Sequence, residues 1–105
     1  MHWASPGLRS EVETAAAVRP VFLSEWGFEQ GSDSVADGTI TNYADPFRQF
    51  VDRLGVSHTA WGAGSSWFPS MFDVNHGLLV GEGVMGGFVE DWFYDKRNDD
   101  RPAGL

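Results

Sequence analysis

The sequence predicts an α/β fold in which helices alternate with parallel strands. Two short runs rich in strand-forming residues, 21–25 and 56–61, each follow a stretch with helical spacing. The first run is continuously apolar at residues 21–23, which is typical of a parallel strand covered on both faces. Because a helical stretch separates the two runs, we expect them to pair in parallel through a right-handed crossover.

The first predicted helix covers residues 8–18. Apolar residues recur there at helical spacing behind Ser5 and Pro6, and Pro20 ends the run. The strand that follows ends at Glu25, so a carboxylate stands where an apolar run stops. Residues 29–41 are polar and contain glycine without periodicity, which indicates a loop at the carboxyl end of this strand.

The second helix is predicted to lead into the second strand. Its apolar face consists of Tyr43, Phe47, Phe50, Val51 and Leu54. Asp45 and Pro46 lie near its first turn, and Gly55 is well placed to end it. The strand at 56–61 ends at Trp61 and precedes a long aromatic and glycine-rich segment, and loops of that length tend to be functional.

The last predicted helix covers residues 85–93. The preceding residues 81–86 match G-x-G-x-x-G, the fingerprint of dinucleotide-binding domains. That fingerprint requires a further strand after the helix, with an acidic residue at its end, whereas this chain continues into the charged tail KRNDDRPAGL. We therefore expect a loop before a helix here, and no nucleotide site.

Composition limits the kinds of partner. The 105 residues suffice for one modest domain, and the net charge of -8 opposes binding to nucleic acid or to anionic membranes. A neutral ligand fits better. The N-terminal residues lack the features of a signal peptide, and no apolar stretch approaches the roughly 20 residues that span a bilayer. The three histidines show no metal-ligand spacing, so we expect no metal site.

Two strand ends carry the candidate site residues. The carboxyl ends of parallel strands are where α/β barrels build their sites, and Glu25 and Trp61 stand at such ends. Trp26 is placed to desolvate Glu25 and, like Trp67, to offer aromatic surface on which a sugar ring can stack. The alternatives are a solvated strand end for Glu25 and core packing for the tryptophans.

Three segments taken in order, PVFLSEWG, LGVSHTAWGAGSSWFPSMFD and GEGVMGGFVEDWF, resemble the C-terminal end of glycoside hydrolase family 5, which includes the cellulases and mannanases of clan A. The resemblance implies a TIM (β/α)8 barrel in which residues 21–25 form the seventh strand and residues 56–61 the eighth. Since such a barrel takes about 250 residues, residues 1–105 would be the C-terminal fragment of a catalytic domain. An incomplete barrel needs the missing N-terminal portion as its partner.

The resemblance also implies roles for single residues. Glu25 resembles the nucleophile of a retaining glycosidase. Trp61 resembles the ring that stacks under the sugar at the cleavage subsite. In the family, a cis peptide bond to the next residue commonly holds this ring in place. In a fragment, either isomer of that bond is compatible with the resemblance. His2 matches a substrate-site histidine at the end of the sixth strand, although the family usually has a tyrosine where this chain has Ala4.

The chain departs from the family at the acid/base, which there follows an asparagine, because it contains no Asn-Glu pair. Glu29, Asp73 and Glu82 are better explained as solvated loop residues than as replacements. The expected function is therefore part of a retaining hydrolase of β-1,4-linked polysaccharide, of the endoglucanase type or alternatively a β-mannanase, and inactive alone. The alternative class is a non-catalytic carbohydrate-binding or orphan fragment. Hydrolysis by two carboxylates needs no cofactor, and the resemblance implies a secreted full-length parent.

Overall fold

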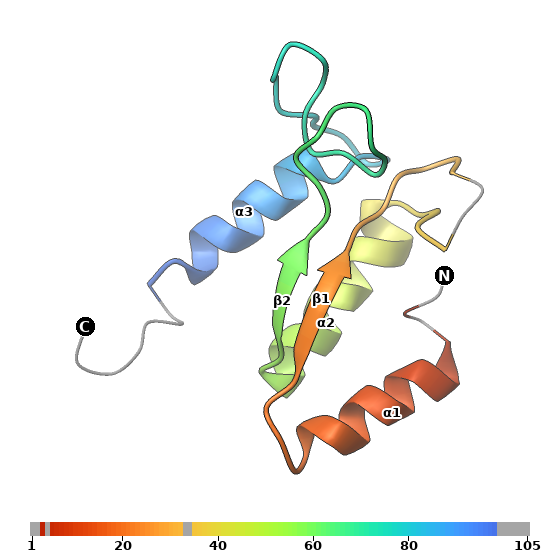
Figure 1. The fold of residues 1–105 in the computed structure, drawn as a ribbon, viewed down its shortest axis with the longest axis vertical. Coiled ribbons are helices and arrows are strands. Elements are labelled where there is room, and N and C mark those ends of the chain that lie inside the picture. The colour runs from red at the N-terminus through yellow and green to blue at the C-terminus, as the bar shows by residue number, and fades with distance from the viewer. Residues whose placement is uncertain (1–2, 4, 33–34, 99–105) are drawn as a thin grey trace.

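A computed structural model describes residues 3, 5–32 and 35–98, and Figure 1 shows their arrangement. In this part of the chain the order is α1 (Pro6–Ala16), β1 (Phe22–Trp26), α2 (Asp45–Leu54), β2 (Ser57–Ala60) and α3 (Gly86–Lys96). The two strands pair in parallel, as the sequence predicts. No helix among the described residues is both long and apolar enough to cross a bilayer.

Helix α1 begins and ends two residues before the predicted bounds of 8 and 18, and it contributes little to the core. The Ser5 hydroxyl accepts a hydrogen bond from the Leu8 N–H at 3.3 Å, and Pro6 occupies the first turn. None of its residues is buried, and only Val12 and Ala16 pack half-buried against the core. Figure 1 shows α1 beside the lower end of β1, away from α3.

The core lies between the sheet, α2 and α3. Helix α2 buries Phe47, Phe50 and Val51 on the predicted face, and Gly55 ends it with a left-handed φ of 66°. Helix α3 buries Phe88, Val89 and Trp92. Trp26 joins the two helices to β1, because its ring centroid lies 4.8 Å from that of Phe47 and 5.5 Å from that of Trp92.

The sheet is covered on one face only. Helix α2 lies behind the two strands in Figure 1, and Phe22 of β1 is 61% exposed. The covering on both faces that the sequence predicts for residues 21–23 refers to a strand inside a complete barrel, and the exposure of Phe22 in the described chain leaves that expectation untested. A continuous apolar run indicates two buried faces only where a second layer exists, and the described residues supply a single layer.

The predicted loop at 29–41 ends sooner than expected, because a π-helical turn, Ile40–Ala44, runs directly into α2. The Thr39 hydroxyl accepts from the Asn42 N–H at 3.2 Å, and the Asn42 side chain accepts from the Thr39 N–H at 2.7 Å. This reciprocal cap starts the turn. The Thr-x-x-Asn spacing was the signal that could have found it.

Residues 81–85 form a turn before α3, as predicted, and Gly86 is the first residue of the helix. A Cβ at Gly86 would collide with the carbonyl oxygens of Met71 and Leu79. Close packing of the helix start against the preceding loop therefore accounts for this glycine without any nucleotide.

Candidate functional site

A β-bulge sets the direction of Glu25. Leu23 pairs with His58 and Trp26 pairs with Ala60, so one strand advances three residues while the other advances two. The extra residue breaks the usual alternation, so that Ser24 and Glu25 are both exposed before the buried Trp26. The Thr59 hydroxyl donates to the Ser24 carbonyl and holds the bulge. Bulges of this kind re-aim side chains next to active sites.

The ends of the two strands are joined where the candidate residues stand. The Trp61 N–H donates to the Trp26 carbonyl at 2.7 Å, which places Trp61 beside the end of β1. Glu25 and Trp61 line one cavity of about 540 Å³. Its other lining residues are Trp3, Leu8, Phe22, Leu23, Ser24, Trp26, Gly27, Val35, Ala36, Tyr43, Phe47, Phe68 and Pro69. The cavity is mainly apolar and aromatic, with Glu25 at one wall.

The segment after Trp61, residues 62–71, forms what we call the aromatic loop. The Gly62 N–H donates to the Pro69 carbonyl at 3.1 Å, and the Met71 N–H donates to the Gly62 carbonyl at 2.9 Å. These two bonds close the base of the loop. The Trp61–Gly62 peptide bond is cis, the isomer that the resemblance implies for a complete barrel, and the Phe68–Pro69 bond is also cis.

Glu25 is the one carboxylate among the described residues that line this cavity. The other titratable lining residue is Tyr43. Burial raises the pKa of Tyr43 to about 12, and a hydrogen bond with the Gly27 backbone lowers it in part. The phenol is therefore neutral at physiological pH and poorly matched to general acid catalysis, which favours a pKa near the operating pH. The described lining thus offers one carboxylate and no second one.

The tryptophans predicted to bind substrate fall in different environments. Trp61 is half-exposed at the cavity, while Trp67 is 66% exposed on the aromatic loop with its ring centroid 5.6 Å from that of Trp61. Trp26 is 6% exposed, and its indole N–H donates to His58 Nδ1 at 2.9 Å. It therefore packs in the core and does not cover the exposed Glu25, contrary to its expected desolvating role. His2 lies outside the described residues.

The three acidic residues considered as replacement acids lie elsewhere. None of Glu29, Asp73 and Glu82 lines the Glu25 cavity. Asp73 instead accepts the N–H groups of Asn75 and Gly77 at 2.8 and 2.9 Å, so it orders the loop after β2. Glu82 accepts the Thr41 N–H at 2.7 Å and caps the turn before α2.

Phe68 was missed by the sequence reasoning. It lines the Glu25 cavity although 65% of its surface is exposed, so its ring stands at the cavity mouth. The adjacent Trp-Phe pair inside a glycine-rich loop was the available signal. An exposed aromatic pair there is hard to explain by core packing.

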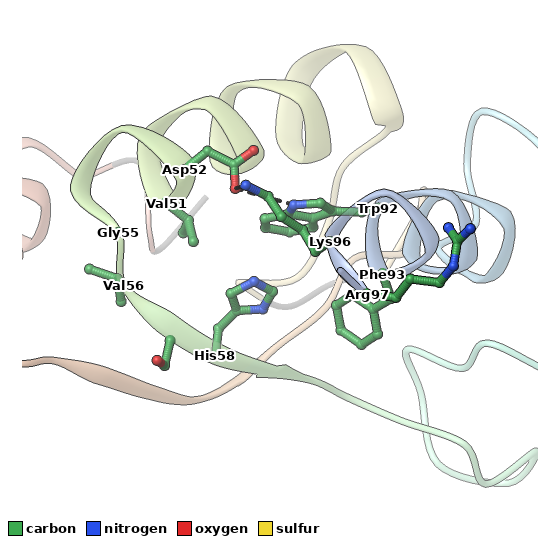
Figure 2. A pocket seen from close by; sticks show the side chains of 10 residues that line it. Val51, Asp52, Gly55, Val56, His58, Trp92, Phe93, Lys96 and Arg97 are labelled. Atoms are coloured by element: carbon green, nitrogen blue, oxygen red, sulfur yellow. Dashed lines mark hydrogen bonds and ion pairs between the residues drawn. The ribbon is translucent and has the colours of Figure 1, made fainter. Parts of the chain in front are cut away.

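A second cavity, of about 600 Å³, lies at the amino end of β2 between α2 and α3. Figure 2 shows His58 facing Trp92 there, with Lys96 directed toward Asp52. The His58 and Trp92 rings stack at 4.3 Å, and Asp52 pairs with Lys96 at 3.5 Å and accepts from the Trp92 indole N–H at 3.3 Å. Although it is the larger cavity, its polar groups serve helix packing, and it holds none of the predicted site residues.

No protein-family model matches the chain, and neither the curated proteins nor the solved structures gave a significant match. Among the residues that the structure describes, no three histidine, aspartate or glutamate side chains are grouped as a metal ion would require. The functional assignment therefore depends on the geometry around Glu25 and on the resemblance.

Proposed function

We propose that this chain is part of a retaining glycoside hydrolase acting on neutral β-1,4-linked polysaccharide, and that Glu25 is its nucleophile. The observation that carries the proposal is the shared cavity of Glu25 and Trp61, each at the carboxyl end of one of two paired parallel strands. In a TIM barrel this is the catalytic face. An exposed carboxylate beside aromatic rings suits attack on a sugar stacked against them.

The chemistry assigns Glu25 one half of a two-carboxylate reaction. An oxygen of Glu25 forms an ester bond to the anomeric carbon while the bond from that carbon to the leaving oxygen breaks. A second carboxyl group, about 5 to 5.5 Å away, protonates the leaving oxygen and later removes a proton from the water that cleaves the ester. Since Glu25 is the single carboxylate among the described lining residues, we assign the second group to a complementary barrel portion.

A non-catalytic carbohydrate-binding role is the second candidate. The exposure of Trp67 and Phe68 favours it, because large exposed aromatic side chains mark interaction sites. In that role the same aromatic surface holds glycan, and Glu25 contributes a hydrogen-bond acceptor without attacking the sugar.

A substrate whose leaving group needs no general acid distinguishes the catalytic role from the non-catalytic binding role. Dinitrophenyl β-cellobioside and β-mannobioside carry a leaving group that departs without protonation, so the missing acid does not prevent the first step. We expect the chain to release at most one equivalent of dinitrophenolate and then stop, because the base for the second step is also missing. The two sugars report whether glucan or mannan fits better.

The control variants locate the reaction. Glu25→Gln should abolish the release, whereas Glu29→Gln, which changes a nearby carboxylate outside the cavity, should retain it. Release that persists in Glu25→Gln would contradict the nucleophile assignment. Oligosaccharide binding without any release would favour the non-catalytic role.

A further inference from the structure

His58 links the core to the strand that carries Glu25. It lies half-buried on β2, and its Nδ1 accepts the Trp26 indole N–H at 2.9 Å. Its ring faces Trp92 in Figure 2, and the two ring centroids are 4.3 Å apart. An apolar ring could fill the same space, but it could not accept the Trp26 N–H. The hydrogen bond is therefore what requires a histidine nitrogen at this position.

The residues on both sides of Glu25 are held by side chains of β2. Before it, the Ser24 carbonyl accepts the Thr59 hydroxyl. After it, the Trp26 indole donates to His58. Glu25 is itself exposed, so the direction of its carboxylate depends on the backbone of these two neighbours. Such positioning matters for a nucleophile, because a displacement of about 1 Å can lower a rate about a hundredfold.

The bond between Trp26 and His58 requires a neutral imidazole. In the neutral ring one nitrogen accepts and the other carries the proton, whereas an imidazolium donates from both nitrogens. Protonation therefore removes the acceptor and sets two N–H groups against each other. Histidine is the side chain that ordinarily changes its charge between about pH 5 and 8. The hydroxyl of Thr59 does not titrate in this range, so only one of the two bonds beside Glu25 responds to pH.

The charged groups around this imidazole do not favour a further positive charge. The cavity of about 600 Å³ that it lines also contains Asp52 from α2 and Lys96 and Arg97 from α3. Asp52 is the one carboxylate among the described residues of that lining, and it already pairs with Lys96 at 3.5 Å and with Arg48 at 3.6 Å. On β1, Glu25 lines the other cavity. These surroundings therefore favour the neutral ring that accepts from the indole.

We propose that His58 is a positioning residue for Glu25, that it acts through Trp26, and that it does so only while its ring is neutral. Protonation releases the Trp26 indole, and the strand then turns the Glu25 carboxylate out of line for attack. This inference rests on the proposed function, because it concerns that attack. His58 is not among the lining residues of the Glu25 cavity, so it exchanges no proton with the substrate.

The rate of dinitrophenolate release from dinitrophenyl β-cellobioside reports the attack, and its leaving group needs no proton. For the full chain we expect this rate to fall about ten- to a hundredfold between about pH 8 and pH 5. His58→Asn keeps a side-chain oxygen that accepts the Trp26 N–H and does not titrate. It should retain the rate at the higher pH and lose most of the fall. His76→Asn is the matched control, because it replaces an exposed histidine whose φ of 64° suits asparagine, and it should keep the fall.

An NMR titration without substrate separates this inference from the proposed function. In wild-type chain the Trp26 indole N–H and the Glu25 amide should shift over the same pH range as the His58 ring. In His58→Asn neither signal should shift in that range. Coupled shifts without any dinitrophenolate release would refute the proposed function and retain the positioning of the Glu25 carboxylate.

Three results would overturn the role of His58. The first is a fall in rate that is as large in His58→Asn as in wild-type chain. The second is a Trp26 indole signal that stays constant while the His58 ring titrates. The third is a Glu25 amide that does not follow a shifting Trp26 indole. The last two use wild-type chain, so they decide the question even where the variant does not fold.

Discussion

At the scale of single residues, the sequence neighbours Glu25 and Trp26 lie in opposite environments. Glu25 is exposed at the bulge, while the adjacent Trp26 is buried and donates its indole N–H to His58 Nδ1. This bond also indicates the tautomer of His58, because an accepting Nδ1 leaves the ring proton on Nε2. The core thus fixes the strand beside the exposed carboxylate.

Replacing Trp26 with phenylalanine keeps an aromatic ring but removes this donor. We expect a loss of about 1 to 3 kcal/mol, because His58 Nδ1 loses its donor in a partly buried place, with a further loss from the smaller ring. Amide hydrogen exchange in β1 and β2 measures the change. Trp67→Phe, the same substitution at an exposed ring, should change protection by less than about 0.5 kcal/mol, and equal effects of the two would contradict this role.

Glu82 provides a pH-dependent contact. Hydrogen bonds from the Thr41 side chain and then from its backbone N–H hold the pKa of Glu82 below its usual range. Because the folded pKa is the lower one, the stabilisation is present above the unfolded pKa and is lost as pH falls through the folded value. The Thr41 amide shift in NMR should therefore titrate at a pH below the ordinary range of glutamate.

A matched pair of variants isolates this titration. Glu82→Gln should remove it from the Thr41 amide, while Glu90→Gln, at an exposed position of α3, should leave it unchanged. A Thr41 amide that does not respond in wild-type chain would show that the cap is absent.

At the scale of elements, contact between the end of β1 and the aromatic loop depends on Gly27. A Cβ at this position would collide with the Trp61 carbonyl oxygen and lie only 3.0 Å from Pro69 Cγ and 3.2 Å from Met85 Sδ. The absence of a side chain thus lets β1 end directly beneath Trp61. The same closeness brings Glu25 into the cavity that Trp61 lines.

Gly27→Ala should therefore weaken both the fold and the site. Overpacking of this kind typically costs about 1 to 3 kcal/mol, so we expect a lower apparent thermal midpoint and a smaller dinitrophenolate burst. Gly64→Ala is the matched control, since a Cβ there meets nothing within 4 Å. If Gly27→Ala behaved like Gly64→Ala, the close approach would have no energetic importance.

The sequence predicted the helices and strands better than it predicted the bulge and the side-chain positions that depend on tertiary contacts. Periodicity located α2 and its buried face, and the strand-end rule brought Glu25 and Trp61 together, because both depend on local pattern and topology. The bulge could not be predicted, since it arises from register with a partner strand. For the same reason, the sequence did not predict the direction in which the Trp26 side chain points. The position of Phe68 depends on loop closure, which has no periodic signal.

At the scale of the whole molecule, one face of the sheet has no covering layer in the described chain. Helix α1 likewise has no described element packed over it that buries its side chains. The two strands form a sheet of their own, so each has an unpaired edge. Phe22 and Val18 are mostly exposed, and α1 has no buried residue. Burial of apolar surface stabilises the fold by about 25 cal/mol per Å², while ordering each residue's backbone costs roughly 1 to 2 kcal/mol. Elements that bury little apolar surface are therefore only marginally stable.

We therefore expect the isolated chain to be partly unfolded, with α1 the least ordered element, or self-associated despite its net charge of -8. Size-exclusion chromatography should show concentration-dependent elution, and thermal melting should give a broad transition. A compact monomer with a cooperative transition would show instead that the 105 residues form a complete domain.

The central claim is that Glu25 attacks the anomeric carbon, and trapping the ester tests it most directly. Dinitrophenyl 2-deoxy-2-fluoro-β-cellobioside needs no acid to react, and its fluorine slows breakdown of the ester. Intact mass followed by peptide mapping should place one fluorocellobiosyl group on Glu25 and none on Glu25→Gln. An adduct on another residue, or no adduct on chain whose β1 and β2 amides are protected from exchange, would contradict the account.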